Sequence, residues 1–522
     1  MALIANRKRD AALARVAQWA TKSSAPGAGA DPDQVFAELQ KNILGRVVRP
    51  GDPDYDKDRK ISNPAVDAHP KVIVYAATQA DVRWALWAAR ELGWALTTRS
   101  GGHSSAGYSV NDAFVLDTSE LNGIMVDEGA MLARVGPGTP LAMLNDTLDA
   151  YDLAVPGGLC ADVCVAGHMS GGGFGLLSRH FGLNLDHVVQ VKMALADGRF
   201  VVADRLQNPD LFWAARGGTG NNFGVLLEVT YRLERLGAVF GVGVTWPLDE
   251  AASVLAFLQE HYMRRGSVTD RKTGTPRFGY MPVLTYVTKA DGSGTEPVLL
   301  VVGVYDGTRA EGLAALEPLL AQGHPTIRKD TVDRYYRLND SLLDILPGPS
   351  GFETKRGKLV NKRMAVADWQ KLVDYFKSSP NGYNLIALEP YGGAVNAVPT
   401  SATAYIHRDC DFNVFIDSFY PDASQYDAAV KWMNDGLALV DGFWNGHMYQ
   451  NYPFDPDPEY RWMYWGDSYP SLLFVKHKYD PNEVFRFPQG ISAYPDGVKR
   501  SNAPSRFHDP HIVALPSPPP FK

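Results

Sequence analysis

Three glycine-rich segments between residues 97 and 224 constrain this chain more than any other feature of its sequence. They occupy residues 97–109, 156–175 and 213–224. Glycine accepts backbone torsions and close approaches that a side chain would block. None of the three has the strand–GxGxxG–helix form of a Rossmann site or the GxxxxGK[ST] form of a P-loop. Glycines concentrated in three loops of one region indicate backbone pressed against one large ligand.

The first segment has the composition of an anion-binding loop. It reads T-T-R-S-G-G-H-S-S-A-G-Y-S from Thr97 to Ser109. Successive backbone N–H groups there could form a concave nest for a pyrophosphate, with Arg99 and the serine hydroxyls as further donors. A surface turn is the alternative, because Ser/Gly clusters are commonly loops. A strand at 72–76, a helix that begins at Thr78 and a strand at 95–98 are predicted to precede it.

Together the three segments resemble the FAD-binding domain of the vanillyl-alcohol-oxidase superfamily and, within it, the berberine-bridge-enzyme-like oxidases. The first matches R-S-G-G-H-S, whose histidine binds the flavin through its 8α carbon, which implies His103. The second matches G-x-C-x-x-V-G-x-x-G-H-x-x-G-G-G-x-G, whose cysteine bonds the flavin C6 carbon. That implies Cys160, although Cys164 stands where the family usually has glycine and is the alternative tether. The likeness runs from about residue 63 to 494.

The resemblance implies an α+β fold with a two-part FAD-binding domain of the PCMH type and a substrate domain. The expected boundaries are an N-terminal helical extension packing on the flavin domain at 1–62, the FAD-binding domain at 63–236, the substrate domain at 237–451 and a C-terminal return at 452–522. In the substrate domain, predicted strands such as 241–246 and 298–305 alternate with predicted helices such as 251–261 and 309–320. Such alternation is typical of an antiparallel sheet covered by helices. Further helices are predicted at 9–22, 31–43 and 469–478.

The catalytic residues are inferred from two short stretches. The sequence Y-Q-N-Y at 449–452 resembles the family's Y-x-N-Y motif, whose second tyrosine is the usual base, which implies Tyr452. Because the ordinary pKa of tyrosine is about 10, a nearby cation or donor is expected. The family places an acidic or amide helper on the strand around 412–419. Strict register gives Ile416, which cannot do acid–base chemistry, whereas a shift by one residue gives Asp417, on the same face as Asn413.

The resemblance also implies the other residues of the site. Val163, three residues after the tethering cysteine, is the small residue that the family associates with oxidases, and His168 is expected to order its loop. The expected flavin-binding residues are His103, Cys160, Arg99, Ser100, Gly101, Gly102, Ser104, Val163, Gly167, His168, Gly171, Gly172, Gly173, Gly224, Val229 and Gln489. The expected substrate-binding residues are Tyr391, Tyr449 and Trp444.

Composition excludes several classes of partner. A net charge of −7 and a pI near 6.0 argue against nucleic acid, which requires a basic face. No stretch approaches the roughly 20 apolar residues of a membrane span. The first thirty residues lack a signal peptide's apolar core, so the chain is expected in the cytoplasm, or secreted if a leader was trimmed. Three cysteines make neither a disulfide framework nor a metal site. A monomer or small homo-oligomer is expected.

These inferences predict an FAD-dependent oxidase that acts on a small-molecule substrate and O2. Hydride would pass from an alcohol carbon to flavin N5, with a sugar or oligosaccharide hemiacetal favoured, and O2 would become H2O2. The alternative within this class is oxidation or oxidative cyclisation of an alkaloid or polyketide. An alternative of another class is a non-catalytic flavin-binding protein, because Ile416 and Ser468 depart from the family pattern.

Overall fold

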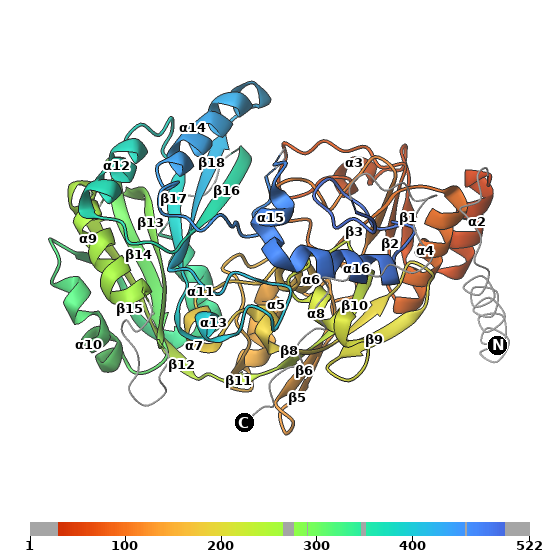
Figure 1. Cartoon of the computed structure of the whole chain (residues 1–522), viewed down its shortest axis with the longest axis horizontal. Coiled ribbons are helices and arrows are strands. Elements are labelled where there is room, and N and C mark those ends of the chain that lie inside the picture. Colours follow the sequence, from red (N-terminus) through yellow and green to blue (C-terminus); the bar gives the residue numbers. More distant parts are fainter. Residues whose placement is uncertain (1–29, 265–275, 290, 346–350, 455–456, 496–522) are drawn as a thin grey trace.

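The structure is a computed structural model that describes residues 30–264, 276–289, 291–345, 351–454 and 457–495. Figure 1 shows two parts side by side, one built on a large sheet with helices on its outer face and the other on smaller sheets. The helix predicted at 9–22 lies outside the described residues. None of the helices in the described ranges combines the length and apolar composition of a bilayer-spanning segment.

The first small sheet carries the loop that contains His103. Its strands, in spatial order, are β1 (Arg46–Val48), β2 (Val72–Tyr75), β4 (Phe114–Asp117) and β3 (Leu96–Arg99). β2, β4 and β3 are parallel, and helix α4 (Gln79–Leu92) connects β2 to β3. Thr78 and Asp81 cap α4 reciprocally, and Gly93 ends it at a φ of +64°. The predicted strand–helix–strand unit is confirmed, and the loop begins at the carboxyl end of β3.

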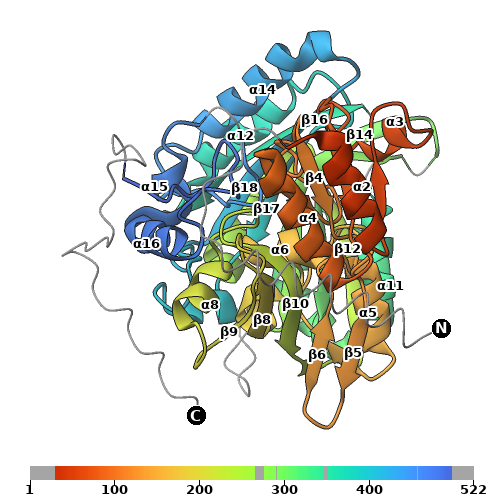
Figure 2. The same cartoon turned by 90° about the vertical axis from the view of Figure 1, so that its right-hand side faces the viewer.

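Two helices cover this sheet from outside. Helix α2 (Pro32–Asn42) lies against α4, as Figure 2 shows. The apolar side chains Phe36 and Leu39 of α2 join the buried core beneath α4. Asp31 accepts a hydrogen bond from Asp33 N at the start of α2, and Pro32 occupies its first turn. A short helix, α3 (Tyr55–Asp58), follows β1.

The second sheet is antiparallel throughout, and the other two glycine-rich segments lie in connections between its strands. Its strands, in spatial order, are β5 (Ile124–Asp127), β6 (Leu132–Val135), β10 (Val225–Arg232), β8 (Val188–Ala194) and β9 (Phe200–Asp204). β8 and β9 form a hairpin around Asp197-Gly198. The helices of this region are α5 (Leu141–Asp149), α6 (Val165–Ser170), α7 (Ser178–Phe181) and α8 (Pro209–Ala215). A separate ribbon pairs β7 (Leu153–Ala154) with β11 (Glu234–Arg235).

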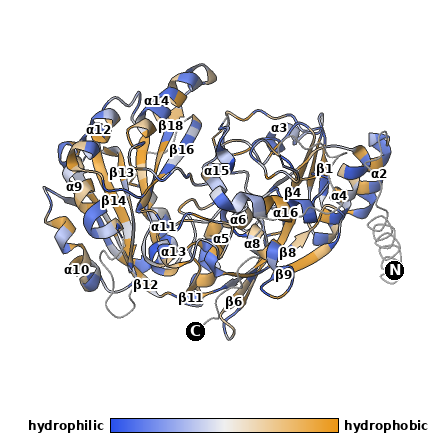
Figure 3. Ribbon diagram, in the orientation of Figure 1, coloured by the Kyte–Doolittle hydropathy of each residue, from blue (hydrophilic) through white to orange (hydrophobic). Residues whose placement is uncertain are grey.

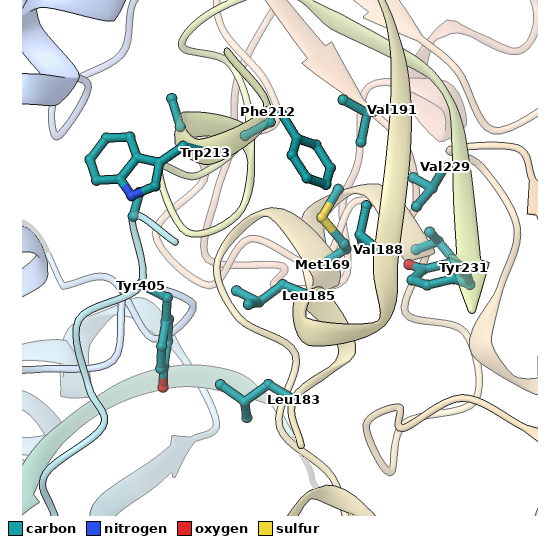
Figure 4. Close-up of a cluster of buried hydrophobic side chains, with 14 of the residues drawn as sticks. Met169, Leu183, Leu185, Val188, Val191, Phe212, Trp213, Val229, Tyr231 and Tyr405 are labelled. Atoms are coloured by element: carbon teal, nitrogen blue, oxygen red, sulfur yellow. The ribbon is translucent and has the colours of Figure 1, made fainter. Parts of the chain in front are cut away.

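Figure 4 shows the core that joins these helices to the second sheet. Met169 of α6 packs among Val191 of β8 and Tyr231 of β10 in one buried cluster. Tyr405, from a distant part of the chain, belongs to the same cluster. The core therefore continues from the second sheet into the segment at 391–411, which connects two strands of the large sheet.

The large sheet has seven strands, and every neighbouring pair is antiparallel. In spatial order they are β15 (Thr326–Arg334), β12 (Ala238–Pro247), β14 (Thr295–Tyr305), β13 (Phe278–Thr288), β17 (Leu385–Pro390), β18 (Phe412–Tyr420) and β16 (Phe352–Val360). Helices α9 (Ala251–Leu258), α10 (Arg309–Leu320), α12 (Val366–Phe376) and α14 (Tyr426–Ala438) cover one face. The central strands β13 and β14 are strongly apolar (Figure 3). The predicted α+β fold, with an antiparallel sheet covered by helices, is confirmed.

Two details differ from the sequence predictions. Helix α9 ends at Leu258 and continues as a wider π-helical turn over Gln259–Met263, where a single helix to residue 261 was predicted. Helix α11 (Tyr335–Leu343) lies at the uncovered face of the large sheet, near α5. Helix α11 therefore covers one end of this face of the large sheet, and the rest of the face is turned toward the first part of the chain.

After the large sheet the chain returns to the first part. Helices α15 (Tyr460–Trp465) and α16 (Tyr469–Tyr479) lie there in Figure 1. The buried ammonium of Lys476 fixes this C-terminal segment to the first part. It donates to Asp480, to Asn222 O at 2.6 Å and to Phe485 O at 2.5 Å. Phe485 also forms a bridge with Leu96 of β3. The C-terminal segment thus packs on the sheet that carries the His103 loop.

Candidate active site

A cavity of about 790 Å³ lies between the large sheet and the first part of the chain. All three glycine-rich segments contribute to its walls, together with strands β13, β16, β17 and β18. The apolar side chains on these strands that line it are Met281, Val283, Leu385, Ala387, Phe415 and Phe419. A cavity of this size can hold the ring system of a large cofactor together with a substrate.

Arg99 supports the first loop from inside the protein. Its Nε donates to Asp117 Oδ2 at 2.5 Å, Nη1 donates to Asp58 O at 2.8 Å and Nη2 donates to the Tyr75 hydroxyl at 3.1 Å. The side chain is almost fully buried. The prediction that Arg99 donates to a bound pyrophosphate is therefore corrected, because its guanidinium is already engaged by the protein. Arg99 borders the cavity and fixes the end of β3.

Serine hydroxyls in the same loop are placed to receive a polar ligand. Ser105 Oγ and Ser109 Oγ are buried and have no hydrogen-bond partner among the described residues. Both residues line the cavity, as do Ser100 and Ser104. Buried hydroxyls are normally hydrogen-bonded, so an orphaned pair facing a cavity points to a polar ligand. The phosphates and ribityl hydroxyls of FAD fit this set, so the residues present agree with a bound flavin.

Several of the glycines have a role that differs from the predicted one, because they allow close packing within the protein. A Cβ atom on Gly101 would lie 2.9 Å from Cys164 Sγ, so that the first and second loops touch only because this residue is glycine. A Cβ on Gly175 would lie 1.7 Å from Gly157 O, and one on Gly217 would lie 2.2 Å from Tyr405 N. Many of these glycines are therefore pressed against the protein itself. Gly171, Gly172 and Gly173 likewise contact side chains and do not line the cavity.

The two candidate thiols differ sharply. Cys164 is buried, its Sγ donates to Gly138 O at 3.2 Å, and burial raises its pKa to about 12. Both residues line the cavity, but of the two it is the Cys160 side chain that is exposed toward that space. The enclosing protein raises the pKa of the Cys160 thiol, although the nearby Lys355 ammonium opposes the rise. Cys160 is therefore the thiol that a ligand in the cavity can reach.

The two histidines at the cavity also differ. His103 Nε2 lies 2.9 Å from Asp162 Oδ2, an aspartate in the loop between the two cysteines. His168 accepts a hydrogen bond from Gly158 N at 3.1 Å, and burial lowers its pKa to about 4. His168 is accordingly neutral and orders the second loop, in the way the sequence predicts, whereas His103 lies on the first loop and contacts the second through Asp162.

Tyr452 forms a short hydrogen bond to a buried glutamate that the sequence analysis missed. Its hydroxyl donates to Glu389 Oε1 at 2.5 Å, and Asn413 Nδ2 donates to Glu389 Oε2 at 2.9 Å. Burial raises the pKa of Glu389 to about 7. Burial, together with the Glu389 charge, also raises the pKa of Tyr452 well above 10. Tyr452 can therefore act as a base only if its own proton passes to Glu389.

A buried lysine stands beside this pair. Lys355 Nζ lies 2.7 Å from Asp417 Oδ2, 3.0 Å from Glu353 Oε1 and 5.2 Å from the centre of the Tyr452 ring. Burial opposes its charge, but the two carboxylates raise the pKa of Lys355 on balance. Burial raises the pKa of Asp417. Lys355 is a cation of the kind that the sequence analysis expected near Tyr452.

The structure shows which residue of β18, Ile416 or Asp417, faces the cavity. Ile416 is fully buried against the helices, whereas Asp417 lines the cavity and Asn413 lies on the same face. However, Asp417 is paired with Lys355 and does not contact Tyr452. The residue that holds the Tyr452 hydroxyl is Glu389. Its sequence signal was a single acidic residue in the apolar strand L-I-A-L-E-P, on the same face as Leu385 and Ala387.

Besides Gly171, Gly172 and Gly173, three further residues predicted for the site do not line the cavity. Tyr391 is fully buried, with its hydroxyl 2.5 Å from that of Tyr405. Trp444 packs at the side of β16, where Lys358 Nζ lies 4.8 Å from its ring centre. Val229 belongs to the core in Figure 4. These three are corrected to structural residues.

Other predicted residues do reach the cavity. Tyr449 lines it and fixes the second loop, since its hydroxyl accepts from Gly173 N at 3.0 Å. Gln489 lines it while accepting from the Tyr464 hydroxyl at 2.7 Å. The remaining cavity-lining members of the predicted set are Ser100, Gly101, Gly102, Ser104, Val163, Gly167 and Gly224. Within the described ranges, no cluster of three or more His, Cys, Asp or Glu side chains could hold a metal ion.

Comparison with known proteins agrees with this architecture. Residues 70–204 match the family model described as FAD binding domain, and residues 448–492 match the one described as berberine and berberine like. The FAD-linked oxidoreductase YvdP of Bacillus subtilis is 30% identical over 459 residues, which cover 86% of this chain and 98% of that protein. The carbohydrate oxidase of Microdochium nivale is 29% identical over 479 residues, covering 85% and 92% of the two chains.

Two further matches extend the range of relatives. The aclacinomycin-N/aclacinomycin-A oxidase of Streptomyces galilaeus is 28% identical over 493 residues, which cover 82% of this chain and 86% of that protein. A solved structure of the Microdochium nivale carbohydrate oxidase with a substrate analogue superimposes with a TM-score of 0.75 at 25% identity, covering 88% of this chain and all of that one. The chain belongs to the berberine-bridge-enzyme-like family of FAD-linked oxidoreductases, within the vanillyl-alcohol-oxidase superfamily.

Proposed function

We propose that this chain is an oxidase that holds FAD by two covalent bonds, through His103 and Cys160, and oxidises an alcohol carbon. A sugar or oligosaccharide hemiacetal is the favoured donor, and O2 is the acceptor, giving H2O2. The observation that carries the proposal is the hydrogen bond from Tyr452 to Glu389 at the wall of the cavity. Bound FAD would supply the redox chemistry by accepting hydride, and the protein would supply position and a base.

Proton transfer follows from the Tyr452–Glu389 pair. Tyr452 takes the proton of the substrate hydroxyl as its own proton moves to Glu389. Asn413 holds the other carboxylate oxygen of Glu389 at 2.9 Å, so the carboxylate stays aimed at Tyr452. Lys355, 5.2 Å from the ring centre, favours negative charge on Tyr452 during the transfer. Glu389 must be ionised to accept, and its pKa of about 7 makes it a matched base near neutral pH.

The walls around Tyr452 support a hydroxyl-rich substrate. The Phe415 and Tyr452 rings lie 5.0 Å apart and offer an aromatic surface to the apolar face of a sugar ring. Lys355, Asp417 and Glu353 offer donors and acceptors for hydroxyl groups. Because the two carboxylates already neutralise Lys355, the cluster is a poor receptor for a strongly anionic substrate. The carbohydrate oxidase relative supports the same choice.

A second candidate rests on the apolar part of the wall. Met281, Val283, Leu385 and Ala387 form a surface that would also accept a fused aromatic or alicyclic ring. Among the relatives, the aclacinomycin oxidase is named for an action on such a molecule. Oxidation of an alkaloid or polyketide is therefore the alternative. A flavin-binding protein without turnover has less support, since it would not require the Tyr452–Glu389 pair.

The test begins with the absorption spectrum of the purified protein before and after acid precipitation. Yellow colour retained in the precipitate is expected, because covalent flavin stays with the chain. The protein is then mixed without oxygen with a panel of sugars, simple alcohols, alkaloids and polyketide glycosides. Bleaching of the flavin by sugars, followed by H2O2 on admitting air, supports the proposal. A colourless protein, or bleaching by alkaloids or polyketides but not by sugars, contradicts it.

A further inference from the structure

A close contact between His103 and Asp162 lies where the flavin would be attached. The two side chains approach to 2.9 Å, from Nε2 to Oδ2, and both residues line the cavity. Asp162 lies two residues after Cys160 and two before Cys164. It therefore belongs to the same loop as one proposed tether while it contacts the other.

Close packing fixes the position of Asp162 relative to His103. A Cβ on Gly101 would lie 2.9 Å from Cys164 Sγ and 3.1 Å from Asp162 O, so the two loops touch along their backbones. Cys164 anchors the second loop to Gly138 O. The packing of the two loops therefore fixes the backbone at Asp162 beside the loop that carries His103, from where the Asp162 side chain reaches Nε2.

The contact determines which ring nitrogen of His103 carries the lone pair and can react. A neutral imidazole carries one N–H, and a carboxylate 2.9 Å from Nε2 favours the tautomer with the proton on that nitrogen. The lone pair then lies on Nδ1, which is the only ring nitrogen left as a nucleophile. When Nδ1 forms a bond to carbon, positive charge develops on the ring, and a carboxylate at Nε2 stabilises it.

We propose that Asp162 is the positioning residue for covalent attachment of the flavin to His103. It selects Nδ1 as the bonding atom and accepts the proton that Nε2 releases. This inference rests on the covalent attachment in the proposed function and adds to it the residue that assists the bond-forming step.

The step balances with O2 as the oxidant. One proton passes from the 8α carbon to water, and the Nδ1 lone pair forms the bond to that carbon. The Nε2 proton passes to Asp162 and from there to water, since the carboxylate is 78% exposed. The electron pair of the lost C–H bond stays on the flavin ring system, which ends reduced by two electrons. O2 takes up these electrons with two protons and leaves as H2O2.

The test isolates the histidine bond. All variants carry Cys160→Ala, so that a covalent link can form only at His103. Protein produced without flavin is mixed with FAD in air, and the covalent fraction is followed over time by flavin fluorescence on denaturing gels and by peptide mass. Asp162→Asn, whose amide can still accept from Nε2–H but cannot take a proton, should slow attachment about 10- to 100-fold. Asp162→Glu should recover much of the rate.

A matched control removes a comparable pair elsewhere. His69 Nε2 lies 3.3 Å from Asp67 Oδ2, whose side chain is 69% exposed, and neither residue lines the cavity. Asp67→Asn should leave attachment unchanged. Asp162→Ala, which removes both orientation and charge, should in addition give a mixture of Nδ1 and Nε2 links in the isolated flavin peptide. Quenching of FAD fluorescence on initial binding should be equal in all variants, which shows that the apoproteins fold.

The outcomes separate this inference from the proposal on which it rests. If protein with Asp162 intact forms no link at His103, the covalent attachment itself is wrong. If that protein forms the link and Asp162→Asn and Asp162→Ala do so at the same rate and at the same nitrogen, the role of Asp162 is wrong while the attachment stands.

Discussion

On one face of the large sheet, β18 presents Val414 and Ile416 to the covering helices, and that layer is apolar and closed. On the opposite face the same strand presents Asn413 and Asp417, and the neighbouring strand β17 adds Glu389. Charged groups on this second face are buried almost as deeply as the apolar groups on the first, since Asp417 is only 5% exposed. Burial without partners is costly for such groups.

The difference shows what each face is for. The helix-covered face removes apolar surface from water, which stabilises the fold. The cavity face holds buried carboxyls whose pKa values are raised, beside a lysine and a tyrosine, which costs stability and prepares proton transfer. A substitution on one face should therefore change stability, and a substitution on the other should change the rate of flavin reduction.

Tyr452→Phe tests the cavity face at the proposed base. The rate of flavin reduction by a substrate sugar should fall about 10²- to 10⁴-fold, because the substrate hydroxyl then has no proton acceptor. The measurement is anaerobic stopped-flow absorbance of the bound flavin. The midpoint of thermal unfolding should change little, since the ring remains to pack on Phe415. A reduction rate equal to that of the unchanged protein would remove Tyr452 from the role of base.

Glu389→Gln tests the relay behind Tyr452. In the unchanged protein the reduction rate should rise with pH through about 7 and level off above it, because Glu389 accepts a proton only when ionised. The variant should lose this rise and react about 100-fold more slowly at pH 8. Glu389→Asp serves as the control that keeps the carboxylate and should keep a pH-dependent rate. A pH profile that survives in Glu389→Gln would assign the titration to another group.

Ile416→Ala tests the helix-covered face, one residue from Asp417. Ile416 is fully buried, and its Cδ1 fills the space beside Gly436 of α14, where a Cβ would lie 2.5 Å away. The free energy of unfolding should fall by about 2–5 kcal/mol, measured by denaturant titration. The reduction rate per folded molecule should stay within about twofold, because the side chain does not reach the cavity. A large loss of rate in protein that is still folded would show that the two faces are not independent.

How much of this contrast the sequence could predict depends on the residue. The strand–helix–strand unit before His103 followed from a buried apolar run and from capping residues, which act locally. The antiparallel sheet followed from the alternation of predicted strands with predicted helices and from the family resemblance. The choice between Ile416 and Asp417 could not be made from sequence, because a shift of one residue exchanges the two faces of a strand. Glu389 was missed because its partner Tyr452 lies 63 positions away in the sequence.

Arg99 and several glycines were expected to contact the ligand but contact the protein instead. Residue type alone indicated that they face a ligand, but Arg99 is held by Asp117 and several glycines are held by the protein backbone. Tyr391 was assigned to the substrate by the family resemblance and Trp444 by its aromatic ring; Tyr391 is buried in the core and Trp444 packs partly buried against it. Tertiary contacts decide whether a ligand-binding residue type meets a ligand, and such contacts have no local signal in the sequence.

The same contrast between a cavity-facing and a buried side chain recurs, four residues apart, in Cys160 and Cys164. Cys160→Ala should remove one of the two covalent bonds to the flavin, whereas Cys164→Ala should keep both. The reason is that Cys164 Sγ is buried and donates to Gly138 O, while the Cys160 side chain opens into the cavity. Mass spectrometry of flavin-bearing peptides counts the bonds. If Cys164→Ala loses a bond and Cys160→Ala does not, the second loop must rearrange when FAD binds, and exposure in this structure would be a poor guide to the reactive thiol.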